Sequence, residues 1–227
     1  MKRALLVAGA VLGTLCAAVQ ADAIEATSVS STTEFWSWFG SNEARFRNVE
    51  TAEKEALLDE MLSHLQRVSE ALFFEVGGHP DGPTELIITA EGNSKYFDLA
   101  REVVRKAPAL KGWQFIALKP AVGFAFVTTY EGVRVDPKEM WFLPLENSLG
   151  ELGLRIAGPA YQQAVESQFR FACHQLIDGG LGEETASAEV GHLEVGPLPD
   201  DPEAEGYIEI VELPAYISWR NSKAKPN

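Results

Sequence analysis

The chain has 227 residues, of which 33 are acidic and 19 are Lys or Arg, so its formal net charge is −14. Such a surface repels nucleic acid and anionic lipid headgroups, and it favours solubility and basic partners. We therefore expect no nucleic-acid partner, and the length is suited to one sizeable domain.

Residues 1–23 have the pattern of a secretory signal peptide. Lys2 and Arg3 give a basic start, residues 4–18 are almost wholly apolar or small, and Ala21-Asp22-Ala23 supplies the small-residue exit that signal peptidase recognises. We predict cleavage after Ala23, or after Ala21 as the neighbouring choice, and a periplasmic or secreted location. The apolar stretch is short for a bilayer and no other long one follows, so no integral membrane segment is expected after cleavage.

Removal of residues 1–23 leaves 204 residues with a formal charge of −15. Cys173 is then the only cysteine, so no disulfide can form within the chain and the core must suffice without one. Because Cys173 shares the apolar side of a predicted helix with Phe169 and Leu176, we expect it to be buried.

The first element of the mature chain is an aromatic helix. Residues 24–33 before it are small and polar and predict a flexible leader. Five of the thirteen residues from Glu34 to Phe46 are aromatic, with helical spacing and a capping-box pattern of Ser31 and Glu34 at the start. Burial of the rings in a core is the simpler interpretation. The alternative is a ring-lined groove in which Trp36 and Trp38 bind a partner or ligand.

The next residues predict a helix, a hairpin and a further helix. Apolar side chains at spacings of three and four indicate a helix over 50–70. The period changes to two over 72–76 and 84–90, and the turn-rich residues between these stretches predict a β-hairpin. A helix follows over 94–106, and Pro108 stops it.

The rest of the chain is rich in strands. A long helix opens at Gly158-Pro159 and is expected to end at Gly179-Gly180. A loop over 181–188 and a short docking turn over 214–219 complete the pattern, and residues 220–227 are expected to be disordered. The predicted strands are 113–118, 124–130, 133–135, 140–145, 152–157, 190–195 and 207–211.

This order of elements indicates an α+β fold. We expect a single domain over 34–219, with a mostly antiparallel sheet and helices packed on one face. No internal repeat and no linker long enough to separate two domains is found in the sequence.

Six short motifs occur along the chain in the same order as in a known family, which the chain therefore resembles. They lie at Phe35 to Glu43, Phe73 to Val76, Glu85 to Gly92, Trp113 to Pro120, Trp141-Phe142, and Leu181 to Glu184. Together they resemble an uncharacterised bacterial family that opens with an FWxWF-type aromatic helix followed by Asn-Glu. The resemblance spans most of the mature chain. It implies a single domain and no particular mechanism.

The hairpin contains the pattern closest to catalytic chemistry. If Val76 pairs with Thr84, then Glu75 faces Glu85 directly across the two strands. Carboxylates that share a site can raise the pKa of one of them, as general acid–base catalysis requires. A register shift by one residue would separate the pair, and a solvated sheet edge would leave it without a function.

Few other residues suggest chemistry. No metal-ligand spacing, phosphate-binding glycine loop or serine elbow is present, so neither a metal nor a cofactor is predicted. His174 and Asp178 are four residues apart on a predicted helix, but two ligands make a poor metal site. The adjacent Glu183 and Glu184, in the loop after that helix, are further binding candidates.

Three classes of function are open. The first, which we favour, is an exported, non-enzymatic binding or accessory module for a basic protein or a small molecule. The second is a hydrolase that uses Glu75 and Glu85, and it requires both carboxylates to line one concave pocket. The third is an acidic inhibitor of a basic enzyme, which requires a clustered acidic face.

Overall fold

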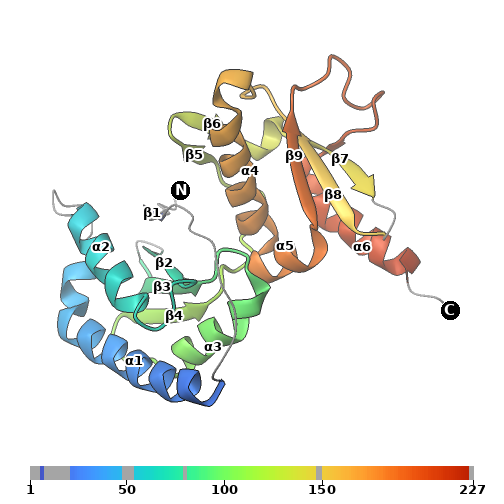
Figure 1. The fold of residues 1–227 in the computed structure, drawn as a ribbon. Helices are drawn as coiled ribbons and strands as arrows, with labels where there is room; N and C mark the ends of the chain where they lie inside the picture. Colours follow the sequence, from blue (N-terminus) through green and yellow to red (C-terminus); the bar gives the residue numbers. More distant parts are fainter. Residues whose placement is uncertain (1–5, 8–20, 48–53, 79–80, 147–149, 225–227) are drawn as a thin grey trace. The chain divides into compact units, whose positions relative to one another are not determined.

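The computed structural model describes residues 6–7, 21–47, 54–78, 81–146 and 150–224 (Figure 1). Internal contacts divide the chain into two compact units, residues 1–118 (unit 1) and 119–227 (unit 2). The single domain expected over 34–219 stays a prediction. Most of the predicted signal peptide lies outside the described residues. Where the chain is described, no helix is both long and apolar enough to cross a membrane.

The α+β fold with mostly antiparallel strands is confirmed, although the strands form three sheets where the sequence analysis expected one. Unit 1 contains a four-stranded sheet. Its elements are β1 (Leu6–Val7), α1 (Ala21–Asn42), η1 (Glu43–Phe46), α2 (Lys54–Leu65), β2 (Phe73–Gly77), β3 (Thr84–Thr89), η2 (Ser94–Tyr96), α3 (Phe97–Arg105) and β4 (Trp113–Ala117).

The sheet of unit 1 has the strand order β1-β2-β3-β4. The predicted hairpin is present as the antiparallel pair β2–β3. The connection through α3 returns the chain to the end of the sheet at which β3 begins, so β4 runs parallel to β3. One face presents Phe74, Val76, Leu86 and Ile88 to a core that also contains side chains of α1, α2 and α3. The predicted packing of helices on one face therefore describes this unit.

The start of α1 differs from the prediction. Residues 24–33, expected to be a flexible leader, belong to α1. The helix therefore does not begin at Ser31, and Ser30 Oγ instead donates to Glu34 Oε1 at 3.0 Å, one turn along the helix. Ser and Thr are only moderately poor helix formers, and residues that extend an existing helix avoid the cost of nucleating a new one.

Unit 2 contains a four-stranded sheet and a two-stranded sheet. Their strand orders are β10-β7-β8-β9 and β5-β6. The elements are β5 (Thr128–Tyr130), β6 (Val133–Val135), η3 (Pro137–Glu139), β7 (Trp141–Glu146), β8 (Leu152–Ala157), η4 (Gln163–Val165), α4 (Glu166–Leu181), α5 (Glu183–Glu189), β9 (His192–Gly196), β10 (Ile208–Glu209), η5 (Ile210–Glu212) and α6 (Leu213–Ala224).

Three helix predictions in unit 2 need correction. The long helix begins at Glu166 and passes through Gly179-Gly180 to Leu181, so these glycines do not end it. The turn comes instead at Gly182, whose φ of +81° is accessible to glycine at little cost. The predicted loop is the short helix α5, and α6 includes both the predicted docking turn and residues 220–224 of the predicted tail.

The two units share one order of elements. In unit 1 a hairpin (β2–β3) is followed by α3 and by the parallel strand β4, and in unit 2 a hairpin (β7–β8) is followed by α4, α5 and the parallel strand β9. A single turn of 3₁₀ helix precedes the crossover helix in both, as η2 and as η4. This repeat is one of strand order and connection rather than of residues, so it cannot be seen in the amino-acid sequence.

Candidate functional site

The rings of the aromatic stretch are core residues. Phe35, Phe39 and Phe46 are 0–1% exposed and Trp36 is 5% exposed. The indole N–H of Trp36 donates to the carbonyl of Val103 at 2.8 Å, so its one polar atom is satisfied inside unit 1. This burial favours the core interpretation over a groove in which Trp36 binds a ligand.

Trp38 lies at the margin of the same core. Its ring is half-buried and stacks on the imidazole of His64, with ring centroids 4.0 Å apart and planes 13° from parallel. Burial lowers the pKa of His64, and the charge of Arg67 lowers it further. The neutral imidazole is therefore favoured in the stack, and Trp38 is occupied by a contact between α1 and α2.

A carboxylate that the sequence analysis missed joins this stretch to β4. Glu43 Oε2 accepts from the indole N–H of Trp113 at 2.5 Å and pairs with Arg47 Nε at 2.7 Å. Arg47 and then Trp113 hold the pKa of Glu43 below its usual value. Arg47 also donates to the carbonyl of Lys111 at 2.7 Å. The Asn-Glu motif after the aromatic helix thus has a structural role.

The predicted opposition of Glu75 and Glu85 is wrong. The structure pairs Glu75 with Ile87, and Glu85 with Gly77. This register differs by two residues from the predicted one and pairs Val76 with Leu86 in the core. A shift by two preserves the face, so both carboxylates lie on the face opposite that core, but diagonally.

This diagonal arrangement weakens the catalytic interpretation. Diagonal neighbours across an antiparallel pair are about 7–8 Å apart, farther than directly opposite residues, which are about 4.5–5.5 Å apart. Glu75 is buried at 3% exposure, whereas Glu85 is half-buried. The two side chains therefore have different environments and are not the directly opposed pair that the catalytic hypothesis assumed.

Glu183 and Glu184 also have different environments. Glu183 is fully buried, its Oε2 accepts from the backbone N–H of Lys119 at 3.0 Å, and its own N–H donates to the carbonyl of Lys119 at 2.9 Å. Glu184 is exposed at the surface. Glu183 therefore fixes the start of unit 2, a role that the predicted loop could not reveal.

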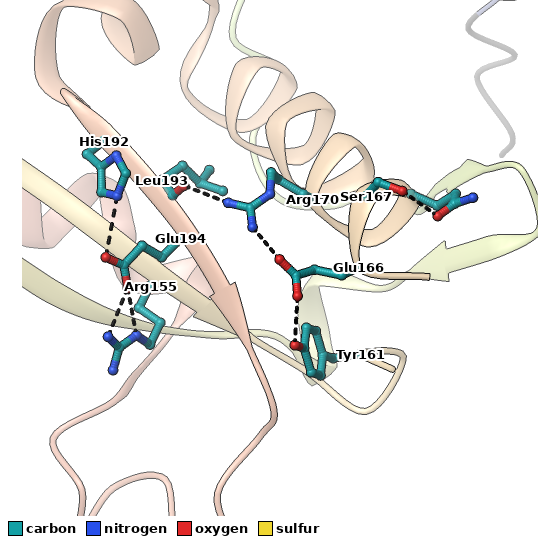
Figure 2. A network of polar contacts seen from close by, with 9 residues as sticks. Arg155, Tyr161, Glu166, Ser167, Arg170, His192, Leu193 and Glu194 are labelled. Atoms are coloured by element: carbon teal, nitrogen blue, oxygen red, sulfur yellow. Dashed lines mark hydrogen bonds and ion pairs between the residues drawn. The ribbon is translucent and has the colours of Figure 1, made fainter. Parts of the chain in front are cut away.

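A polar network involves β8, β9 and α4 of unit 2 (Figure 2). Arg155 and Glu194 are partners in the parallel register, and Arg155 donates to Glu194 Oε2 at 2.8 and 3.0 Å. His192 lies 3.4 Å from the other carboxylate oxygen. Arg155 holds the pKa of Glu194 below its usual value.

A second arm of the network joins α4 to the edge strand β9. Arg170 on α4 pairs with Glu166 at 2.5 Å and donates to the carbonyl of Leu193 at 3.3 Å (Figure 2). Tyr161 donates to the second oxygen of Glu166 at 3.2 Å. Since β9 is an edge strand, the contact to Leu193 links α4 to the edge strand of the sheet. Both arginines are therefore paired with carboxylates of the same unit.

The described part of the chain offers no other catalytic constellation. It brings together no group of three or more His, Cys, Asp or Glu side chains that could hold a metal ion. Cys173 is fully buried, as predicted, and burial raises the pKa of its thiol far above the usual range. A thiol in that state is a packing group rather than a nucleophile.

The surface of unit 2 differs from that of unit 1. Among the described residues, all the large hydrophobic side chains that are exposed belong to unit 2: Val122 (37%), Val127 (45%), Val211 (39%) and Trp219 (56%). Unit 2 also has 17 acidic side chains and 8 Lys and Arg. Exposed apolar groups on an acidic surface are features of a binding surface.

No protein-family model, curated protein or solved structure matches the chain. The arguments about function therefore depend on the chain's own residues. Those residues provide structural roles for Trp36, Trp38 and Glu183, and leave the surface of unit 2 as the candidate site.

Proposed function

We propose that the protein is an exported, non-enzymatic binding module whose partner is a basic protein. The observation that carries this proposal is the distribution of charge in unit 2. Each of its arginines is already paired with a carboxylate: Arg134 with Asp136, Arg155 with Glu194, Arg170 with Glu166 and Arg220 with Glu146.

The excess acidic groups remain available to a partner. Asp200, Glu203, Glu205, Glu209 and Glu212 are exposed and make no ion pair within the described part of the chain. A basic partner would be attracted by this excess, and the attraction would weaken as salt increases.

Export is part of the proposal. It is supported by the basic start, apolar stretch and small-residue exit of residues 1–23. Membership in the FWxWF-type family is likewise a proposal, and it would add no activity. If the basic partner is an enzyme, the module would act as its inhibitor.

The charge proposal can be tested with octa-arginine and octa-glutamate peptides. Residues 24–227 should bind octa-arginine by isothermal titration calorimetry, more weakly as salt rises, and should not bind octa-glutamate. A double variant of unit 2, Glu203→Gln with Glu205→Gln, should weaken binding more than the matched unit 1 variant, Glu55→Gln with Asp59→Asn, whose sites are also exposed. Equal effects of the two variants, or no binding, would contradict the proposal.

A further inference from the structure

Residues 119–127, which we call the strap, lead into β5 and lie along α4. The N–H of Val122 donates to the carbonyl of Gly179 at 2.8 Å. The ring of Phe126 lies on Gly179 and the ring of Phe124 lies on Gly180, so close that a Cβ at either glycine would collide with them. The two glycines within α4 therefore form the surface on which the strap packs, which we call its seat.

Both ends of the strap are fixed. At its start, Lys119 is held by the side chain and the backbone of Glu183. Ala121 approaches Gly182 so closely that a Cβ there would lie 2.8 Å from its nitrogen. After the strap, Thr128 Oγ1 is 3.0 Å from Gln175 Oε1. In Figure 1 α4 lies beside β5 and β6, with which it makes contacts.

The outer side of the strap is apolar and exposed. From Phe124 to Glu131 half-buried and exposed residues alternate, with Phe124 and Phe126 toward α4 and Ala125 and Val127 exposed. Val122 and Val127 are two of the exposed large hydrophobic residues of the described chain. Side chains that contact α4 thus alternate along the strap with side chains that face solvent, as they do in a β-strand with one buried face.

The backbone of the strap has hydrogen-bonding capacity to spare. None of residues 123–127 makes a backbone hydrogen bond to another described residue. The chain bends at Phe124 and Phe126, the residues whose rings lie on α4. The strap is thus an anchored segment with free N–H and C=O groups, the kind of template to which an extended chain can add.

We propose that the strap is the docking edge for an extended, basic segment of the partner protein. This inference rests on the proposed function, because the acidic excess of unit 2 selects a cationic occupant. The partner backbone would bond to the free groups of residues 123–127, and its alternate side chains would cover Val127 and Ala125. A second copy of the chain is disfavoured as the occupant, because residues 24–227 of each copy carry the same formal charge of −15.

The test uses a peptide of four Arg-Val repeats, (Arg-Val)₄, with (Glu-Val)₄ as its charge-reversed counterpart. Residues 24–227 should bind (Arg-Val)₄ saturably and should not bind (Glu-Val)₄. Val127→Lys places a like charge on the strap and should weaken binding by about tenfold, equivalent to about 1.4 kcal/mol. The matched control is Ala56→Lys, at an exposed residue of α2 in unit 1, which should leave the dissociation constant within about twofold of the unmodified protein.

A second variant addresses the backbone directly. Ala125→Pro removes an N–H that makes no hydrogen bond to another described residue, so loss of peptide binding by a variant with an unchanged circular dichroism spectrum supports the docking edge. If Val127→Lys and Ala125→Pro both bind (Arg-Val)₄ as Ala56→Lys does, the docking edge is wrong while the basic-partner function stands. Failure of the unmodified protein to bind any basic peptide overturns both. A dimer in light scattering that either strap variant dissociates would identify a second copy as the occupant and overturn the inference.

Discussion

Unit 1 and unit 2 build the same order of hairpin, crossover helix and parallel strand with different side chains. The core of unit 1 is dominated by rings that contact one another, such as Trp36 with Phe115 at 4.8 Å and Phe39 with Trp113 at 4.9 Å between centroids. The core of unit 2 is mainly aliphatic, with Leu154, Ile156 and Leu176 among its fully buried members.

The difference shows that topology does not determine which unit carries a surface for binding. Unit 1 uses its aromatic residues to fill its interior, and its described residues expose no large hydrophobic side chain. Unit 2 uses the glycines of α4 to seat two rings and leaves valines and Trp219 exposed. We therefore expect the buried rings of unit 1 to contribute mainly to the stability of the fold, and the surface of unit 2 to contribute mainly to the binding of a partner.

The largest effect should come from removing a buried ring of unit 1. Phe39→Ala should lower the free energy of unfolding by about 3–5 kcal/mol, because the side chain is fully buried among other rings. Trp219→Ala, which removes an exposed ring of unit 2, should change it by less than about 0.5 kcal/mol. Urea unfolding measures both, and similar losses would remove the contrast between the units.

A smaller effect is expected at the seat of the strap. Gly180→Ala should destabilise the protein by about 1–3 kcal/mol, because the new Cβ collides with the ring of Phe124. Gly40→Ala, in α1, is the matched control, since nothing lies within 4 Å of its Cβ position. It should stabilise the protein by up to about 1 kcal/mol through helix propensity. Thermal unfolding that shows the same sign for both would refute the close packing of the strap.

The ion pairs on the surface should contribute less. Arg155→Met removes the cross-strand pair with Glu194, whose side chains are 43% and 38% exposed. The expected loss is about 0.2–1 kcal/mol, and it should shrink in high salt because such pairs are screened. Denaturation at low and high salt would measure it. A loss that is large and insensitive to salt would mean that the network supports more than local pairing.

The smallest effect is visible mainly through pH. The pKa of Glu43 is lowered in the folded state by Arg47 and Trp113. Its contribution to stability is therefore present above the unfolded pKa of about 4.3 and is lost as the pH falls through the lower folded pKa. The stability difference between the unmodified protein and Glu43→Gln should accordingly narrow as the pH falls below that value. A difference that is constant from neutral pH to pH 3 would argue against this carboxylate bridge.

Local patterns in the sequence predicted much of the fold. The change of period from helix to strand after residue 70, the β-hairpin and the three strands from 133 to 157 could be found because each depends on neighbouring residues. The parallel pairings of β4 and β9 depend on strands far apart in the chain, so no local pattern identified them.

The candidate site was harder to predict, because its features depend on distant partners. Gly179 and Gly180 resemble a helix end in the sequence, and only the rings of Phe124 and Phe126 explain glycine there. The pairing of Glu85 with Gly77 could not be predicted from the sequence pattern. Two registers of β2 and β3 that differ by two residues keep every side chain on the same face and differ only in which residues pair. The acidic composition was sufficient to suggest a basic partner, but nothing in the sequence indicated that residues 119–127 would lie along α4.

The central claim, that unit 2 binds through the strap, is tested most directly by amide hydrogen exchange on residues 24–227 with and without (Arg-Val)₄. The account predicts that the amides of residues 123–127, which make no backbone hydrogen bond to another described residue, exchange quickly in the free protein and become protected when the peptide is bound. Amides of unit 1 should not change. Protection confined to unit 1, or a strap that exchanges equally fast with saturating peptide, would contradict the account.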